Sequence, residues 1–320
     1  MTDFSDLKPL GISSKWPRRS AVIKSLREVS IRSTSRIAKY NERLDDKNTA
    51  KVVPSVAYGG VGRDLQFSAV GKALERSTWL PDAAHATAYR LFSAKLDYFW
   101  HENFRVLYRD QGRVLNMFDT SLATIDMAFA FILGWSDAAI YQGYLIHSAL
   151  NRKHYLISSY EDEHRRAHAF MLRLFADWRG DVSHDWPSYA YDEPIYEGLL
   201  ECWREPDSAV LLPWLIAACD RHTHEAGRET ATDFYDFSDL TSIRTPLEIL
   251  MLFRLRECIG LRTPVIEHPL MEEPFDRLPE VQPMYETDEL MKATLQRVRQ
   301  DWPLFDQIVA SDVIKSTQQE

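Results

Sequence analysis

The chain has 320 residues, 45% of them hydrophobic, with 12 glycines and 15 prolines, a composition that allows a large core and excludes disordered, collagen-like and low-complexity proteins. Three widely spaced cysteines without a C-x-x-C pair exclude a disulfide framework and a zinc knuckle. The longest apolar run, 121–135, is too short to span a membrane and contains Asp126. We therefore expect a cytoplasmic protein. Basic and acidic residues number 11 and 6 over 1–50, nine each over 51–150, and 18 and 32 over 151–320, so the second half favours a basic partner and disfavours nucleic acid.

Helical periodicity dominates the chain and predicts an all-α fold, a multi-helix bundle of stacked antiparallel helical hairpins. A basic amphipathic helix is predicted over about 20–44. It is followed by an expected loop or linker over 47–62, which carries three glycines. The chain therefore divides into a basic N-terminal helix with its linker, residues 1–62, and an acidic helical body, residues 63–320, with a further boundary near residue 110.

Eight more helices are predicted in the body, each from apolar residues that recur at helical spacing. They cover 81–109, 115–135, 136–151, 158–179, 193–205, 207–225, 246–258 and 288–302. Pro81 suits a first helical position, where its missing N–H would have no partner, and Ser158 with Glu161 has the spacing of a capping box. Residues 261–287 contain five prolines and are expected to be irregular but anchored by apolar side chains.

The most suggestive chemical motif is Glu161-Asp162-Glu163-His164, with His168 one turn later. Glu-x-x-His is a di-iron motif of helical bundles, and two histidines at i and i+4 can share one metal ion. A di-iron site needs a second Glu-x-x-His, and the sequence has none. His164 and His168 also fall in line with an apolar helical stripe, so we expect no metal and no cofactor. A helical metal-dependent enzyme that uses Glu161, His164 and His168 is the alternative.

Other motif searches give no catalytic site, and we expect no enzyme. Gly59-Gly60-Val61-Gly62 lacks the residues of a phosphate-binding loop and is predicted to be a flexible connection. The polar cluster around His222 lies near a predicted helix C-terminus, where the macrodipole stabilises histidine. Basic residues near Trp16 offer a third reading, a nucleic-acid-associated protein; the more ordinary outcome is a solvated face, or docking on the acidic remainder of the chain. These basic residues are Lys15, Arg18, Arg19, Lys24 and Arg27.

One family resemblance rests on a set of residues in the second half of the chain. They are Pro246-Leu-Glu-Ile-Leu-Met-Leu-Phe-Arg254-Leu-Arg256, Gly260-Leu-Arg-Thr-Pro264, His268-Pro269-Leu270, Pro274 and Leu278-Pro279, with Tyr196, Leu199, Trp203 and Cys219-Asp220-Arg-His222 upstream. Mainly over residues 110–280, the chain resembles bacterial immunity proteins paired with type VI secretion effectors. The PoNi family, all-helical antidotes to DNase toxins, and the TsiT-like immunity proteins of restriction-endonuclease-like toxins are the groups that it resembles.

The resemblance implies an immunity protein that binds a cognate secreted toxin, a nuclease in the first instance, and neutralises it by stoichiometric occlusion. Such a protein needs no catalytic residue. Its partner would present a basic cleft, and an acidic body supplies the opposite potential. The expected toxin contacts are acids in clusters outside the apolar stripes. They are Glu161, Asp162, Glu163, Asp192, Glu193, Asp233, Asp236, Asp239, Glu272 and Glu273.

Overall fold

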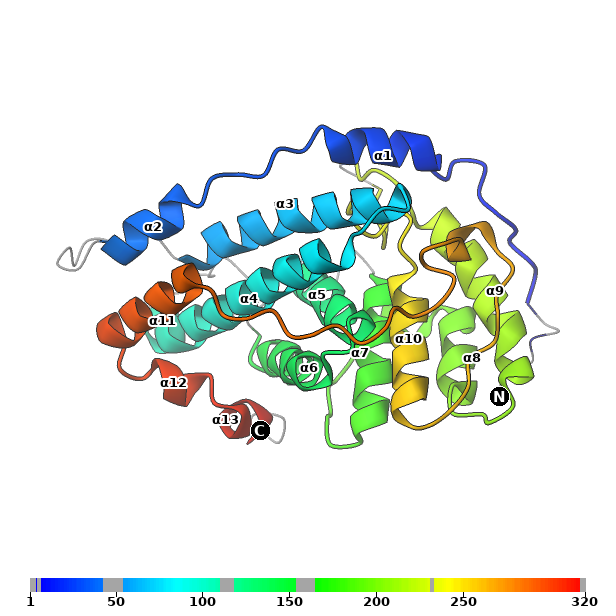
Figure 1. Ribbon diagram of the computed structural model, residues 1–320. Coiled ribbons are helices and arrows are strands. Elements are labelled where there is room, and N and C mark those ends of the chain that lie inside the picture. Colours follow the sequence, from blue (N-terminus) through cyan, green and yellow to red (C-terminus); the bar gives the residue numbers. More distant parts are fainter. Residues whose placement is uncertain are drawn as a thin grey trace.

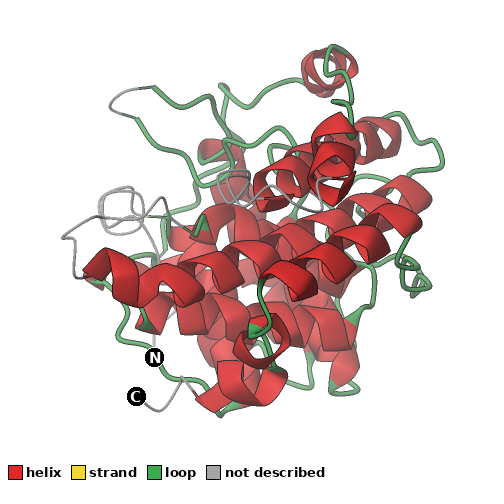
Figure 2. Cartoon of the chain, turned by 90° about the vertical axis from the view of Figure 1, so that its left-hand side faces the viewer, coloured by secondary structure: helices red, strands yellow, loops and turns green. Residues whose placement is uncertain are grey.

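The computed structural model describes residue 4 and residues 7–42, 54–109, 118–153, 165–230 and 233–316. In these residues every regular element is a helix, and Figure 2 shows helices and loops without a strand. The predicted all-α fold is confirmed. No helix in these ranges is long and apolar enough to cross a membrane.

The centre of the molecule is a long hairpin of α3 (Pro54–Leu74) and α4 (Leu80–Arg109), which make the most extensive contact between any two helices (Figure 1). A second hairpin, α5 (Thr120–Ile132) and α6 (Ser136–Asn151), packs on α4. Consecutive helices therefore pair and stack, as the periodicity predicts.

The remaining long helices extend this stack. α7 (Arg166–Arg179) and α10 (Leu247–Cys258) pack on α5 and on each other, and α8 (Pro194–Cys202) forms a hairpin with α9 (Ser208–His224). Single 3-10 turns lie at Ser188–Tyr191 and Pro269–Met271. The chain ends in α11 (Glu289–Asp301), α12 (Phe305–Ile308) and α13 (Ser311–Ser316). The capping box expected at Ser158 and Glu161 lies outside the described residues.

A buried ion pair fixes the first two hairpins to each other. Asp126 of α5 is 1% exposed, and Arg90 of α4 places its Nε 3.0 Å from both carboxylate oxygens. The same guanidinium donates to the Gly59 carbonyl of α3 at 3.2 Å. The one acid of the apolar run 121–135 is thus paired inside the core, as a buried carboxylate must be.

The single basic helix expected over 20–44 is wrong, because two short helices occupy this region. α1 (Arg19–Arg27) and α2 (Ser35–Glu42) flank an irregular stretch, 28–34. That stretch is rich in serine and β-branched residues, which are weak helix formers. Asp64 of α3 also accepts the backbone N–H of Arg32 at 2.9 Å, so a contact distant in sequence competes with the helix.

The linker expected over 47–62 is also wrong from residue 54 onward, because α3 begins at Pro54 and contains the glycines. These glycines serve close packing and do not form a flexible connection. A Cβ on Gly59 would lie 2.8 Å from Ser93 Oγ, and one on Gly62 would lie 2.9 Å from Arg90 Cγ. The expected boundary after residue 62 falls within α3.

Candidate functional site

The acids expected to contact a partner fall into four groups in the structure, the last of which, Glu272 and Glu273, lies on a surface segment described below. Glu161, Asp162 and Glu163, together with His164, lie outside the described residues. Asp192 is exposed and pairs with Arg166, with 2.5 Å between Oδ1 and Nε. Asp233 is exposed and closes a turn in which Thr230 Oγ1 donates to its carboxylate at 2.9 Å. These two acids are accessible, although each has a partner within the chain.

Three of the expected contact acids are instead structural, which corrects their placement on an accessible surface. Asp236 is 5% exposed and accepts the Ala167 N–H at 3.0 Å, capping the start of α7. The side chain of Asp239 is 8% exposed and pairs with Arg63 at 2.6 Å. Glu193 accepts from the Ile195 N–H at the start of α8 and pairs with Arg221 at 2.9 Å. Their carboxylates accept from helix N-termini or pair with arginines of the same chain.

His168, Asp236 and Asp239 line a polar cavity of about 400 Å³, which also contains Arg63 and Arg165 at its wall. His168 is 5% exposed, and its Nδ1 lies 3.6 Å from Asp236 Oδ1, beyond hydrogen-bond distance. In the described ranges no group of three histidine, cysteine or acidic side chains is arranged to hold a metal ion. Glu161 and His164 are outside those ranges, so the metal-enzyme alternative stays untested.

His222 does not sit at a solvated helix end, as the macrodipole explanation requires. Its ring is fully buried and stacked on Phe237, with centroids 3.6 Å apart. Nδ1 lies 2.8 Å from the buried Glu248 carboxylate and Nε2 lies 3.0 Å from the Ser242 carbonyl. These contacts join α9 to α10 through a fully buried polar side chain.

The basic residues near the N-terminus turn largely toward the body of the same chain. We call residues 7–42 the basic segment. In it Arg19 pairs with Glu272 at 3.2 Å, Arg27 with Glu75 at 2.6 Å and Arg32 with Asp64 at 2.7 Å. Docking on the acidic remainder of the chain, which was expected as the alternative to a solvated face, is confirmed for Arg19 and Arg27, and Arg32 docks in the same way.

A second surface segment has the opposite charge. We call residues 261–288, between α10 and α11, the acidic strap; it carries seven acidic residues and two arginines. Figure 1 shows it in orange, crossing the front of the molecule toward α11. It has no regular element except a single 3-10 turn. The irregular but anchored segment predicted from its prolines is confirmed.

The strap is held in one conformation by side chains and by the body beneath it. Leu270, Met271 and Phe275 are buried. The Gln282 N–H donates to the Leu133 carbonyl at 2.9 Å, and Trp135 Nε1 donates to the Gln282 carbonyl at 3.0 Å. These contacts fix the backbone on either side of the charged positions.

Near its end the strap packs by aromatic stacking. The rings of Tyr285 and His85 are stacked with centroids 4.5 Å apart, and Tyr285 and Tyr89 both donate to the Asp288 carboxylate. Burial lowers the pKa of His85, so its ring is neutral at neutral pH. Burial and then the nearby Asp288 charge raise the pKa of Tyr285. These two stacked rings are therefore both neutral at physiological pH.

Four strap acids are exposed and have no hydrogen bond or ion pair on their carboxylates in the part of the chain that the structure describes. They are Glu267, Asp276, Glu280 and Glu286. Glu272 and Glu273, the two strap acids expected from the sequence, lie beside Arg19 and Arg76, at 3.2 and 3.8 Å, and keep side-chain exposures of 50% and 62%. Val265, Val281 and Met284 on the same strap are 82%, 64% and 58% exposed.

The strap as a unit was missed by reasoning from adjacent acids, which selects only Glu272 and Glu273. The signal that identifies it is charge density over the whole irregular segment, seven acids against two arginines in 28 residues without a helix. Three exposed apolar residues, Val265, Val281 and Met284, lie on the same segment as these acids. Such a mixture of charge and apolar surface is typical of protein interfaces.

Comparison of the chain with protein-family models, with curated proteins and with solved structures gave no match.

Proposed function

We propose that this chain is an immunity protein that binds a cognate secreted antibacterial toxin, a nuclease with a basic surface, in the cytoplasm of the cell that makes it. It neutralises the toxin by stoichiometric occlusion and catalyses no reaction. The acidic strap is the docking surface. The observation that carries the proposal is a backbone fixed by the body, with four unpaired carboxylates beside exposed Val265, Val281 and Met284.

Electrostatics supports this assignment of the surface. Exposed acids that are not already neutralised by the chain attract a basic partner and raise its association rate. Apolar side chains beside them supply burial when the partner docks, which lowers the dissociation rate. A fixed strap loses little conformational freedom on binding, so more of the interaction energy appears as affinity.

The first test identifies the partner. The open reading frame adjacent to this chain is expressed alone and together with it in a bacterial host. We expect a toxin that kills the host alone and is neutralised by an equimolar amount of this chain. A harmless neighbouring product, or a toxin that this chain does not bind, contradicts the proposal.

The second test assigns the surface. The strap variant combines Glu267→Gln, Asp276→Asn, Glu280→Gln and Glu286→Gln. Its control removes four exposed unpaired acids elsewhere, with Glu28→Gln, Asp137→Asn, Asp185→Asn and Asp312→Asn. Both variants change the net charge equally. We expect the strap variant to slow association with the toxin about tenfold at 0.05 M salt, and the control less than about twofold.

Salt provides the internal check on this second test. The Debye length falls from about 10 Å at 0.1 M to about 3 Å at 1 M, so association of the unaltered chain slows as salt rises. The strap variant should lose most of this dependence. Equal slowing by the two variants would place the docking surface elsewhere on the acidic body.

A further inference from the structure

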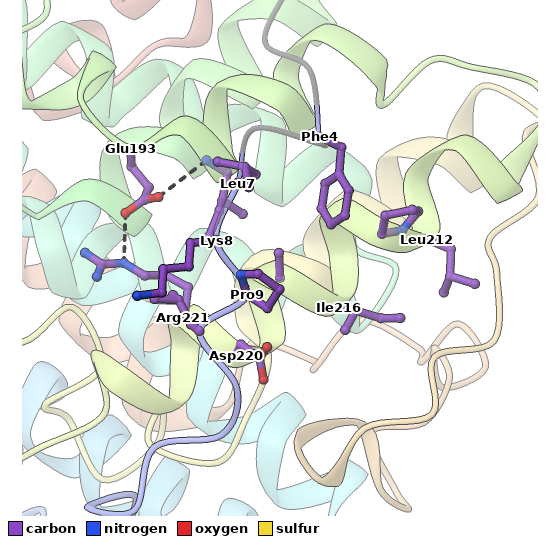
Figure 3. A pocket seen from close by; sticks show the side chains of 13 residues that line it. Phe4, Leu7, Lys8, Pro9, Glu193, Leu212, Ile216, Asp220 and Arg221 are labelled. Atoms are coloured by element: carbon purple, nitrogen blue, oxygen red, sulfur yellow. Dashed lines mark hydrogen bonds and ion pairs between the residues drawn. The ribbon is translucent and has the colours of Figure 1, made fainter.

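The start of the chain encloses a cavity that the proposed function does not use. Phe4 and residues 7–17, here called the arm, cross one face of α9 without regular structure. Figure 3 shows the cavity between them, with Leu7, Pro9 and Phe4 on the arm side and Leu212 and Ile216 on the α9 side. Its volume is about 530 Å³, within the range of small-molecule sites.

The lining is predominantly apolar. Of its thirteen residues nine are apolar. Six of the thirteen belong to α9 and lie on one helical face, since they recur at intervals of one, three or four positions. These six are Leu212, Pro213, Ile216, Ala217, Asp220 and Arg221. The exposures of Phe4 and Ile216, 36% and 38%, show that the arm does not fill the space above the helix. The cavity is therefore suited to an aliphatic chain.

The arm is anchored beyond the cavity, which keeps the cavity's walls in place. The Gly11 N–H donates to Asp220 Oδ2 at 3.0 Å, and the Ser13 N–H donates to Thr223 Oγ1 at 2.8 Å. At the other end the Phe4 ring meets Trp214 edge to face, with centroids 5.2 Å apart. An aliphatic ligand chain that entered between these two anchors would bury the apolar faces of both the arm and α9.

Four charged side chains lie at the rim, and three of them have internal partners. Glu193 pairs with Arg221, which also pairs with Glu225, and Asp220 accepts from Gly11 and lies 3.4 Å from His268 Nε2. Lys8 is exposed and has no hydrogen bond or ion pair in the described residues. Among the charged rim side chains in the described residues, Lys8 is therefore the one that has no partner within the chain.

We propose that this cavity binds an aliphatic carboxylate of the free fatty-acid type, with its chain between the arm and α9 and its carboxylate at Lys8. The Lys8 ammonium, which has no described partner, favours a carboxylate over a neutral or cationic head group. Burial of the aliphatic chain supplies most of the binding free energy, and the interaction with Lys8 determines which head group is preferred.

The test is calorimetric titration of the full chain with dodecanoate below its critical micelle concentration, beside dodecanol and dodecylammonium. We expect saturable one-to-one binding with a negative heat-capacity change. Dodecylammonium should bind at least about tenfold more weakly than dodecanoate. Absence of saturable binding, or equal affinity for the ammonium compound, would overturn the proposal.

Two pairs of variants assign the site. Lys8→Gln should weaken dodecanoate binding about fivefold, whereas Lys15→Gln, at an exposed and unpaired lysine of the same arm, should leave it unchanged. Ile216→Trp should fill the cavity and abolish binding, whereas Val210→Trp, at an exposed position of α9 outside the cavity, should not. Binding that survives Ile216→Trp places the ligand elsewhere and overturns the site.

A spectroscopic measurement does not depend on the cavity-filling variant. Trp214 contacts Phe4 at the cavity, so dodecanoate brominated at its terminal carbon should quench part of the tryptophan fluorescence. That quenched part should be absent in Trp214→Phe, while dodecanoate still binds in the calorimeter. Quenching that persists in Trp214→Phe would contradict the assignment.

Discussion

The basic segment and the acidic strap both cross the surface of the helical body, but they use their charges differently. In the basic segment Arg19, Arg27 and Arg32 reach acids of the body or strap. In the strap Glu267, Asp276, Glu280 and Glu286 form no ion pair among the described residues, and only Glu286 acts at longer range on a cation, Lys292. Charge in the first segment holds the chain to itself, and charge in the second is left for a partner.

Both segments are anchored by buried apolar residues, Val22, Leu26 and Ile37 in the basic segment and Leu270, Met271 and Phe275 in the strap. The basic segment adds ion pairs, which salt screens. The strap adds hydrogen bonds to the backbone of the body, which salt leaves intact. The strap can therefore carry unpaired acids because its conformation does not rely on them. The following predictions test that division, beginning with the largest expected effect.

Removing the buried cation under the strap should have the largest effect. Arg254 is 3% exposed and donates to the carbonyls of Phe131, Ile132 and Pro279 at 2.9 to 3.0 Å. Arg254→Met removes all three bonds and leaves the Ile132 and Pro279 carbonyls without a described donor, while Phe131 keeps the Gly134 N–H, and we expect the free energy of unfolding to fall by about 3 kcal/mol. Chemical denaturation measures the loss.

The control for this prediction is Arg277→Met, at an exposed strap arginine without a described partner, which should change stability by less than about 0.5 kcal/mol. Amide hydrogen exchange of Gln282 should accelerate only in Arg254→Met, because that amide reports the attachment of the strap to the body. Equal losses in both variants would show that Arg254 is not an anchor.

Lowering the pH should destabilise the helical body that supports both segments. Burial lowers the pKa of His147 to about 4, from 6.5 in an unfolded chain. Between pH 6.5 and pH 4 the His147 ring is therefore protonated in the unfolded state but not in the folded state. Its contribution to the free energy of unfolding is complete above pH 6.5 and is lost as the pH decreases toward 4. The loss should be about 2 kcal/mol by pH 5, at 1.36 kcal/mol per pH unit.

Thermal unfolding between pH 7 and pH 5 measures this dependence, and His147→Gln should reduce its slope whatever its effect on stability at pH 7. His184, whose pKa burial also lowers to about 4, contributes to the slope that persists in the variant. A slope that is unchanged in His147→Gln would assign the acid sensitivity to other groups. Binding experiments on the strap should accordingly be made above pH 6.5.

The paired arginines of the basic segment should matter for stability, but less than Arg254. Asp64 is 2% exposed and accepts from the Arg32 backbone N–H at 2.9 Å and from its guanidinium at 2.7 and 3.0 Å. Arg32→Met leaves a buried carboxylate without its cation, and we expect a loss of about 1.5 kcal/mol in denaturant titration. Arg36→Met, at an exposed neighbouring arginine without a described partner, is the control.

A double-mutant cycle sharpens this prediction. Adding Asp64→Asn to Arg32→Met should recover part of the loss, because the amide no longer needs a counter-charge. Additive losses would show that the two side chains do not interact, and the contrast between the segments would then lack its strongest example.

Much of the fold could be predicted from local pattern. The bounds of α6 match the prediction over 136–151, and α10 ends two residues before Gly260, whose φ of +76° suits glycine. The start of α3 could not be predicted, because its glycines are explained by the close approach of α4 and not by chain flexibility. The local sequence pattern therefore predicts a helix end correctly where that end is determined by residues adjacent in sequence.

The candidate site was harder to predict because burial of an acid depends on contacts distant in sequence. Asp236 caps α7 from 69 positions away, and Asp239 meets Arg63 from 176 positions away. An acidic cluster in the sequence looks the same whether its members cap helices or face solvent. The strap could be recognised as irregular from its prolines, but which of its acids are unpaired depends on where Arg19 and Arg76 fold back.

The smallest expected effect is the most direct test of the comparison. Neutralising Glu267, Asp276, Glu280 and Glu286 together removes four charges from one surface segment, yet we expect the free energy of unfolding to change by no more than about 0.5 kcal/mol, and upward. The reason is that none of them has a partner to lose, while each is repelled by the others. The small gain should disappear between 0.05 and 0.5 M salt, because the repulsion is screened.

A loss above about 1 kcal/mol would mean that these acids hold the strap in place, and the strap would then use its charge as the basic segment does. If stability is kept while association with the toxin slows, the same four carboxylates serve binding and not folding, which is the division that separates the two segments.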